Sequence, residues 1–528
     1  MLEQATRDAA PRSRVKPASF SSIPRAVLLA AFTLATFIVQ GYHPLAEDGG
    51  LYIAGVAFTL NPHLFPHYAQ FVSEHLRFSL FAPLLAALIR VTHLPMRFVI
   101  LLIDLASIAF TLAAARSLLR RILADERAQL AGVAMLGALW TLPVAGTSLL
   151  LMDPYVTARS LSTPLSLFAI AFALDPWQRR RRSLAGCVAA LALAAAFHPL
   201  MAGYALGLVL VIRLLRAPHR VGLLLALAVL TLVGTILLQA HARADSPAVV
   251  LASKSRYYWF LSQWHWYELC GLPGPFLVLL AQLRFNRSRL LTPGATLCIA
   301  AMIYGSFAVL LTLLFAQEGY HSHIVARLQP LRSFLMIYIV MVLLLGAGVQ
   351  QLIESGFARL SGRRWQRCSP WALSFTILLA ALTMYTWQRW QFPASAHIEL
   401  PWRAQRSPNP WVRAFLWCRS NTPVDALFAL DANYIATRGE DAETFRATAQ
   451  RSALPDFSKD GGEASITPRL ADTWEAGFKA QLDLSSLNAR QLHSRLTPFG
   501  VTWLVLRSTS PAALDCPYDN GAIKVCKL

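Results

Sequence analysis

The sequence predicts a polytopic α-helical membrane protein of about 11 transmembrane helices, followed by a C-terminal extracytoplasmic α/β domain. Three observations lead to this fold class. Of the 528 residues, 55% are hydrophobic and only 14% are charged, and the mean hydropathy is +0.46. Soluble domains usually carry about a quarter charged residues. Apolar segments recur as far as residue 386, and from residue 387 the composition becomes that of a soluble protein.

The apolar segments define the predicted membrane part. A transmembrane helix needs about 20 mainly apolar residues to cross a hydrocarbon core of roughly 30 Å. We predict spans at 25–42, 97–115, 128–146, 163–176, 183–199, 200–216, 221–240, 272–283, 291–315, 331–349 and 370–386. Together they form a transmembrane domain over residues 25–386. The polar, basic residues 1–24 are expected to form a flexible cytoplasmic tail.

The charge distribution orients these spans. The chain has 48 Lys and Arg against 28 Asp and Glu, a net charge of +20, and basic residues accumulate in cytoplasmic loops. With the N-terminus inside, the inner segments hold 23 basic residues and the outer loops before residue 370 hold 9. The apolar segment 76–94 could be a further span, but crossing there would turn the four arginines at 179–182 outward. We therefore place 76–94 as a juxtamembrane or re-entrant helix in a long first outer loop, residues 43–96.

The distribution of charge also indicates which partners and which cellular location to expect for the protein. Most of the excess positive charge is explained by topology, so a nucleic-acid partner is not expected. We expect an integral protein of the bacterial inner membrane, with its C-terminal domain in the periplasm.

Residues 387–528 are predicted to form the extracytoplasmic α/β domain. They contain 16 basic and 14 acidic residues. Short β-type runs at 426–430, 502–506 and 522–525 alternate with helical patterns at 408–420, 440–452 and 468–480, which is typical of an α/β arrangement. The spacing of Cys516 and Cys526 is compatible with a disulfide in an oxidising compartment and equally with two free thiols.

An acidic pair opens the first outer loop. Glu47 and Asp48 follow the first span directly and precede Gly49, Gly50 and Tyr52. Ionisable groups at a membrane boundary are costly to maintain and are therefore functional candidates. Asp48 could act as a general base, or it could simply cap the helix that follows.

Further polar residues gather in the other outer loops. Asp153 is expected either to cap a helix or to face Asp48 across a shared cavity, and His321 and His323 form a weak metal-binding pattern. Arg327 and Arg332 could clamp a phosphate. Lys254 and Arg256 are two basic residues of the third outer loop, on the side of the membrane where basic residues are scarce. We predict a substrate cavity lined by His43, Tyr52, Arg159, His265, Glu268 and Gln329.

Taken in this order, the features resemble the GT-C superfamily of integral membrane glycosyltransferases. The resemblance rests on the acidic pair with nearby Tyr52, on Asp153 in the next outer loop, and on the Gln-Pro-Leu-Arg sequence at 329–332. It also rests on the C-terminal domain, where Trp411, Trp417 and the strand pattern at 499–506 match the superfamily's pattern. A WWDYG-type motif is missing, so an asparagine-linked oligosaccharyltransferase is not expected.

The resemblance implies roles for individual residues. Asp48 would be the base, and Glu47 or Asp153 would assist it or bind a divalent metal. Arg256, Arg327 and Arg332, with Lys254 nearby, would hold the phosphate of a lipid-linked sugar. No nucleotide cofactor is expected, because the chain has no phosphate-cradling Gly-rich loop and no Rossmann fingerprint.

The leading hypothesis is a glycosyltransferase at the outer membrane face. Its partners would be a polyprenyl-phosphate-linked sugar, membrane lipids, and a glycan, lipid or protein acceptor. The alternatives are a transporter or flippase for a lipid-linked glycan, which usually keeps ionisable residues at mid-membrane, and a non-catalytic glycan-binding protein of the same fold.

Overall fold

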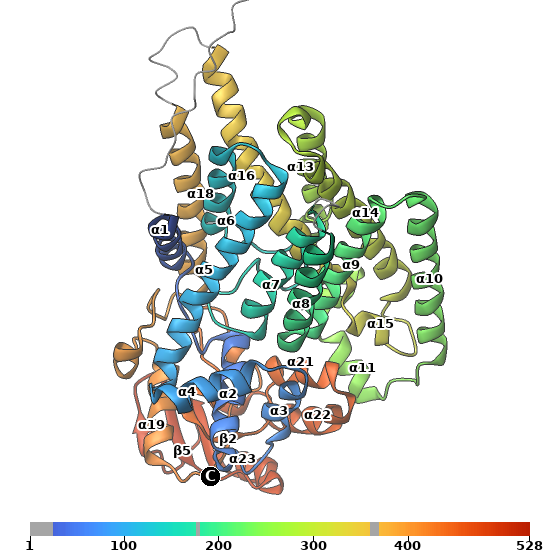
Figure 1. Cartoon of the computed structure of the whole chain (residues 1–528). Coiled ribbons are helices and arrows are strands. Elements are labelled where there is room, and N and C mark those ends of the chain that lie inside the picture. Colours follow the sequence, from blue (N-terminus) through green and yellow to red (C-terminus); the bar gives the residue numbers. More distant parts are fainter. Residues whose placement is uncertain (1–24, 176–179, 360–368) are drawn as a thin grey trace, which may run out of the picture.

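The computed structural model describes residues 25–175, 180–359 and 369–528, so the predicted tail 1–24 lies outside the described residues. Each of the predicted spans overlaps a helix of the bundle in Figure 1. These helices are α1 (Arg25–Gln40), α5 (Met96–Ile122), α6 (Glu126–Ala138), α7 (Ala158–Ala173), α8 (Arg180–Phe197), α9 (Pro199–Leu215), α10 (Arg220–His241), α13 (Pro273–Phe285), α14 (Thr292–Phe315), α16 (Phe334–Arg359) and α18 (Ser369–Gln391).

Part of this bundle is long and apolar enough to cross a membrane. By length and composition, five stretches of the described residues meet that requirement: Met96–Ile122, Arg220–His241, Thr292–Phe315, Ile324–Gly356 and Pro370–Gln391. The hydropathy of α10 reaches 2.7 although 0% of its most apolar window is buried in the protein. An apolar helix exposed on all sides is stable only in lipid. The chain is therefore an integral membrane protein, while the count of 11 spans stays a prediction.

The ambiguous segment 76–94 is bent. The pair Gln70–Phe78 and Phe81–Thr92 meets the span criterion only as a unit, and the two halves are inclined by 99°. The first half comprises α3 (Gln70–Ser73) and the 3₁₀ turn η2 (Glu74–Phe78), and the second half is α4 (Phe81–Thr92). Figure 1 places α3 and α4 at the end of the bundle that carries the C-terminal sheet. This shape fits a broken span or a re-entrant segment.

Helix α2 (Glu47–Leu60) packs tightly at its start because of Gly49 and Gly50. A Cβ atom on Gly49 would lie 2.9 Å from the Cβ of Tyr155, and one on Gly50 would lie 2.2 Å from Oγ1 of Thr444. Tyr155 belongs to the second predicted outer loop and Thr444 to the C-terminal part of the chain. The Gly49–Gly50 pair thus lets the start of α2 fit between these two parts of the protein.

The C-terminal α/β unit, residues 392–528, contains a five-stranded sheet in the order β2-β1-β3-β5-β4. The strands β1, β2 and β3 are mutually parallel, and β3, β5 and β4 are antiparallel. Their bounds are β1 (Leu427–Ala429), β2 (Ser452–Ala453), β3 (Trp503–Arg507), β4 (Tyr518–Asp519) and β5 (Ile523–Lys527). The structure therefore has a strand within each of the three predicted β-type runs.

Helices of this unit cover both faces of the sheet. The unit contains α19 (Pro410–Asn421), α20 (Phe445–Ala449), α21 (Lys459–Ile466), α22 (Ala471–Ala480) and α23 (Ala489–Leu496). Phe428 packs with Phe415 and Phe445 on one face, whereas its neighbour Leu427 packs with Leu492 on the other. This alternation along β1 follows from the period of two in a strand, and it gives the unit a hydrophobic core on each side.

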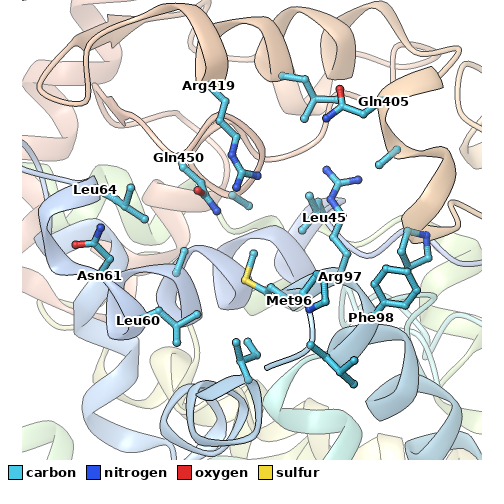
Figure 2. A pocket seen from close by; sticks show the side chains of 18 of the residues that line it. Leu45, Leu60, Asn61, Leu64, Met96, Arg97, Phe98, Gln405, Arg419 and Gln450 are labelled. Atoms are coloured by element: carbon cyan, nitrogen blue, oxygen red, sulfur yellow. The ribbon is translucent and has the colours of Figure 1, made fainter. Parts of the chain in front are cut away.

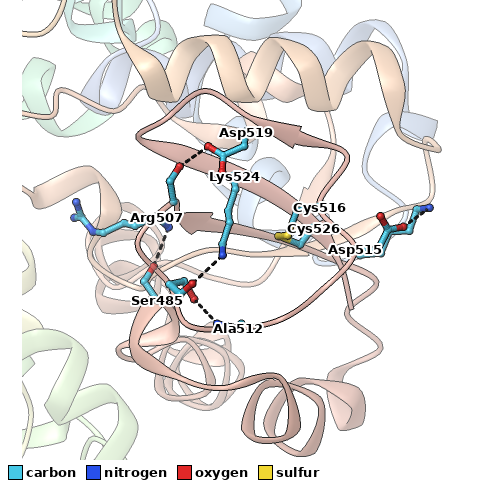
Figure 3. The surroundings of a disulfide bond; sticks show 11 residues. Ser485, Arg507, Ala512, Asp515, Cys516, Asp519, Lys524 and Cys526 are labelled. Atoms are coloured by element: carbon cyan, nitrogen blue, oxygen red, sulfur yellow. Dashed lines mark hydrogen bonds and ion pairs between the residues drawn. A yellow bond between two sulfur atoms is a disulfide. The ribbon is translucent and has the colours of Figure 1, made fainter.

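The chain ends in a disulfide-closed hairpin. Cys516 and Cys526 are bonded (Figure 3), which resolves the alternative that the spacing left open. Around the bond, Lys524 Nζ donates to the carbonyl of Ser510 at 2.9 Å, and Lys527 pairs with Asp515 at 2.9 Å. These contacts fix the edge of the sheet formed by β4 and β5.

Candidate active site

The acidic pair lies in the first turn of α2, and neither acid is its N-cap. That position is held by Ala46, which makes no side-chain capping bond. Glu47 has a φ of 50°, a left-handed conformation that is uncommon outside glycine. Backbone strain of this kind often accompanies functional sites. Both side chains are accessible to solvent, Glu47 at 42% and Asp48 at 56%.

Lys459 bridges the two acids. It is the first residue of α21, and its ammonium group contacts Glu47 and lies 2.9 Å from Oδ1 of Asp48. The protein around Asp48 removes part of its hydration, which acts to raise its pKa. The charge of Lys459, assisted by Arg332 and Arg159, outweighs this desolvation and holds the pKa below its ordinary value of 3.8. Asp48 is therefore ionised at neutral pH.

One carboxylate oxygen of Asp48 is left for a ligand. Only Oδ1 accepts a hydrogen bond within residues 25–175, 180–359 and 369–528. The side chain is more than half exposed, so Oδ2 can accept a hydrogen bond from the hydroxyl group of a bound ligand. An ionised, accessible carboxylate can accept a proton from such a hydroxyl.

The second acid of the site, Asp153, lies beside this pair. It forms an ion pair with Arg159, and both side chains are buried. Arg159 Nη1 also donates to the carbonyl of Leu150 at 2.8 Å. Thr157 holds the N-cap of α7, so Asp153 does not cap that helix. Burial raises the pKa of Asp153, Arg159 opposes the rise and the charge of Asp48 adds to it.

Arg332 supplies a cation that has no carboxylate partner among the described residues. It lies in the 3₁₀ turn η7 (Pro330–Ser333), and its guanidinium carbon lies 5.1 Å from the centre of the Tyr258 ring. Its Nε is buried and has no hydrogen-bond partner among the described residues. The preceding Gln329 is buried, and its carbonyl accepts a bond from the Tyr204 hydroxyl at 2.9 Å. The charge of Arg332 also acts on Asp48 and lowers its pKa, and the unpartnered Nε is available to an anion.

The other predicted phosphate-binding residues are engaged elsewhere. Arg256 donates to the carbonyls of Ser458 at 2.7 Å and Phe457 at 3.1 Å. Arg327, in α15 (Ile324–Arg327), pairs with Asp245 at 3.2 Å and donates to the carbonyl of Ser465 at 2.9 Å. Both arginines thus tie the segment around α21 to the helical bundle, which positions Lys459. Lys254 is exposed at the end of α11 (Pro247–Lys254).

Three of the residues predicted to line the substrate cavity lie away from the acidic pair. His265 and Glu268 form the exposed start of α12 (Trp266–Cys270), where Glu268 accepts the backbone N–H of His265 at 2.8 Å. His43 is buried, lies 3.2 Å from Glu399 and stacks on Phe392. Burial lowers the pKa of His43 to about 3. These residues form structural contacts away from the acidic pair.

Tyr52 does belong to the site, and it leads to residues that sequence reasoning missed. Its ring contacts His75 at 5.4 Å between centroids, and His75 Nδ1 lies 3.7 Å from Oε1 of Glu463. Burial lowers the pKa of His75 to about 4. Burial, with the charges of Asp460 and Asp48, raises that of Glu463 to about 8. Both side chains are therefore mainly neutral at pH 7.

The site has no cluster suited to a metal ion. In the described parts of the chain, no group of three or more His, Cys, Asp or Glu side chains could hold one. His323 pairs with Asp245 at 3.0 Å, and His321 lies 3.3 Å from the carbonyl of Ala242. The ammonium group of Lys459 lies between the two acids, in the place where a cation shared by them would bind. The residues around Asp48 thus do not fit a divalent metal, and we derive no step through one.

Comparison with solved structures identifies the fold. No family model matches the sequence. No curated protein sequence matches it either. The archaeal oligosaccharyltransferase AglB from Archaeoglobus fulgidus, solved with an inhibitory peptide and a dolichol-phosphate, matches with a TM-score of 0.51 at 11% identity, over 91% of this chain and 69% of that chain.

Two further structures are similar at lower scores. ArnT from Cupriavidus metallidurans, in the apo state, has a TM-score of 0.42 at 12% identity, over 95% of this chain and 97% of that chain. The arabinofuranosyltransferase AftD from Mycobacteria has a TM-score of 0.45 at 14% identity, over 96% of this chain and 40% of that chain. At such identities the likeness concerns the fold alone. The fold predicted from the GT-C resemblance is confirmed.

Proposed function

We propose that the protein is a glycosyltransferase that transfers a sugar from a polyprenyl-phosphate donor to an acceptor at the outer membrane face. The observation that carries this proposal is the arrangement around Asp48. An ionised, accessible carboxylate lies in one cluster with Arg332, a cation that has no carboxylate partner among the described residues. A transferase of this type needs a base for the acceptor and a cation for the departing phosphate.

The proposed reaction is a single displacement. The acceptor hydroxyl binds to Oδ2 of Asp48 and attacks the anomeric carbon of the sugar. Its proton passes to Asp48 as the new C–O bond forms. The bond between the anomeric carbon and the phosphate oxygen breaks, and its electron pair leaves with the polyprenyl phosphate. The configuration at the anomeric carbon is inverted.

The surrounding residues have distinct roles in this scheme. Arg332 stabilises the negative charge that develops on the departing phosphate, as a charge-assisted hydrogen-bond donor. Lys459 keeps Asp48 ionised, and the buried Asp153–Arg159 pair adds to the electrostatic surroundings of Asp48. The sugar comes from the lipid-linked donor, so the reaction needs no nucleotide cofactor.

The topology forms part of the same proposal. The N-terminus would be cytoplasmic, and the C-terminal α/β unit would lie in the periplasm of a bacterial cell. The disulfide between Cys516 and Cys526 supports an oxidising compartment for this unit. Asp104, the acid inside a predicted span, accepts a hydrogen bond from Gln40 at 3.3 Å. This local partner favours an enzyme over a transporter for which Asp104 would carry ions.

Replacing Asp48 with Asn tests the proposal. The full chain, purified in detergent, is titrated with undecaprenyl phosphate, and the envelope glycans of cells that carry each variant are compared by mass spectrometry. Asp48→Asn should reduce transfer by about two to four orders of magnitude, the range typical of a lost general base, and should still bind the lipid. The exposed Asp425→Asn is the matched control and should behave like the unchanged protein.

A second variant separates the cation from the base. Arg332→Gln should weaken binding of undecaprenyl phosphate about tenfold or more, because a charge-assisted bond contributes roughly 1.5 to 3 kcal/mol. An unchanged glycan profile with Asp48→Asn would overturn the catalytic proposal and favour the transporter or the glycan-binding protein.

A further inference from the structure

A cavity lies on a different face of α2 from the one that carries Asp48. It has a volume of about 860 Å³ and is lined by the C-terminal part of α2, the ends of α4 and α19, and the start of α5. The 3₁₀ turn η8 (Pro401–Arg406) and α20 complete it. Figure 2 shows this pocket between the first predicted outer loop and the C-terminal α/β unit. Its size lies within the range of small-molecule sites.

Two guanidinium groups enter the pocket from opposite walls. Figure 2 shows Arg97, from the start of α5, and Arg419, from α19, both directed into the open space. Neither side chain has a hydrogen bond or ion pair with another described residue, and Nη2 of Arg97 is buried without a partner. Burial lowers the pKa of Arg419, and the charges of Arg97 and Arg451 lower it further. The two like charges are therefore close enough to repel each other.

The nearest acids do not fully neutralise these arginines. Arg97 acts electrostatically on Glu399 and Glu443, but burial raises the pKa of Glu399 to about 7 and that of Glu443 to about 8. Near neutral pH the two carboxyl groups retain at least one proton between them. A ligand with a negative charge would relieve the repulsion between Arg97 and Arg419.

Besides polar residues such as Asn61, Gln405 and Gln450, the pocket has an apolar wall that leads towards the lipid-facing surface. Its lining includes Leu60, Leu64, Ile89, Leu94, Met96 and Phe98. Beyond the pocket, Val91 is 78% exposed and Leu102, one helical turn after Phe98, is 55% exposed. The Phe98 ring also contacts the exposed Trp402, at 6.2 Å between centroids. Tryptophan is typical of the membrane–water interface, which places the pocket mouth at that boundary.

We propose that this pocket binds an anionic amphiphile, with its phosphate between Arg97 and Arg419 and its hydrocarbon chain along the apolar wall and the exposed face of α5. The site differs from the one around Asp48. Asp48 and Tyr52 lie on one face of α2, whereas Ala57, Leu60 and Asn61 line this pocket. The proposal does not depend on the transferase activity, because it requires only binding.

The test is lipid binding to the full chain in nonionic detergent, measured by native mass spectrometry. The probes are dioctanoyl phosphatidylglycerol, which is anionic, dioctanoyl phosphatidylcholine, which is zwitterionic, and inorganic phosphate. The unchanged protein should bind the phosphatidylglycerol at least tenfold more tightly than either of the others. The double variant Arg97→Gln/Arg419→Gln should lose at least tenfold in affinity for phosphatidylglycerol.

Matched variants distinguish lipid binding in the pocket from attraction of the lipid to surface charge in general. Arg403 and Arg406 lie exposed on η8 and do not line the pocket, so Arg403→Gln/Arg406→Gln removes the same charge and should leave binding within twofold. Ser420→Trp fills the pocket from an exposed position without changing charge, and it should also weaken binding at least tenfold. Equal losses with the two double variants would overturn the proposal, and so would equal affinity for inorganic phosphate and phosphatidylglycerol.

Discussion

A buried pair of carboxyl groups in the C-terminal α/β unit lies against His43 of the first outer loop, and it provides a prediction with a defined sign. Glu443 and Glu399 share a hydrogen bond, Thr448 donates to Oε2 of Glu443 at 2.6 Å, and His43 lies beside Glu399. Such a pair is stable only while it retains a proton. Glu443→Gln reproduces the protonated form, since the amide can donate to Glu399 and accept from Thr448.

The magnitude follows from the shift of the pKa. Burial and the charge of Glu399 raise the pKa of Glu443 from 4.5 to about 8. Between pH 4.5 and about pH 8 the folded protein holds a proton on Glu443 that the unfolded chain releases. The free energy of unfolding therefore falls as the pH rises, by roughly 1.4 kcal/mol per pH unit. The full interval corresponds to about 5 kcal/mol. Because two coupled carboxyl groups titrate as a pair, we expect Glu443→Gln to recover about 2 to 5 kcal/mol above pH 8.

The assay is thermal unfolding of the full chain in detergent, followed by tryptophan fluorescence at pH 5 and pH 8.5. Glu443→Gln should raise the midpoint by several degrees at pH 8.5 and change it little at pH 5. Glu475→Gln, which removes a partly exposed carboxylate paired with Lys479 on α22, should give the same small change at both pH values. An equal effect of Glu443→Gln at both pH values would refute the reasoning, because the carboxyl group would then not be protonated in the folded state.

Two further predictions concern the start of α2. Lys459→Gln removes the cation that lowers the pKa of Asp48, so this pKa should rise by about one to two units. The acid limb of the pH profile of transfer should then move to higher pH by the same amount. An unmoved limb would contradict the role of Lys459. Gly50→Ala places a methyl group 2.2 Å from Oγ1 of Thr444 and should destabilise the protein by about 1 to 3 kcal/mol. Gly203→Ala, which meets nothing within 4 Å, should be neutral or slightly stabilising in the same unfolding measurement.

Much of the fold could be predicted because it depends on local patterns. Apolar segment length located the helices of the bundle, and short β-type runs located β1, β3 and β5. Part of the site was also accessible, since costly polar residues at a membrane boundary singled out Asp48, Asp153, Arg159 and Arg332. Whether Cys516 and Cys526 are bonded depends on the geometry of β5, which spacing alone does not specify.

The site residues that the sequence did not reveal are those brought in by contacts between distant segments. Lys459 is separated from Asp48 by 411 positions, and its sequence context is that of an ordinary surface helix. The sequence likewise cannot distinguish an arginine that binds a ligand from one that binds backbone carbonyls. Arg256 and Arg327 belong to the second kind, because their partners lie around α21. The available sequence signal for the role of Arg256 was a second Gly-Gly pair, at Gly461 and Gly462. A Cβ on Gly461 would lie 3.0 Å from Nη2 of Arg256, so the pair allows the arginine to approach α21 closely.

The C-terminal α/β unit is best understood as part of the site and not as an appendage. It contributes Lys459 to the acidic pair, Thr444 to the close packing of Gly50, and Glu443 to the buried carboxyl pair. The first two contacts involve α2, and the contact of His43 with Glu399 connects the carboxyl pair to the residues just before that helix. The same helix separates the cluster around Asp48 from the pocket that contains Arg97. Because the C-terminal unit contacts α2 and also lines that pocket through η8, α19 and α20, a shift of this unit would alter both the pairing of Lys459 with Asp48 and the walls of the pocket.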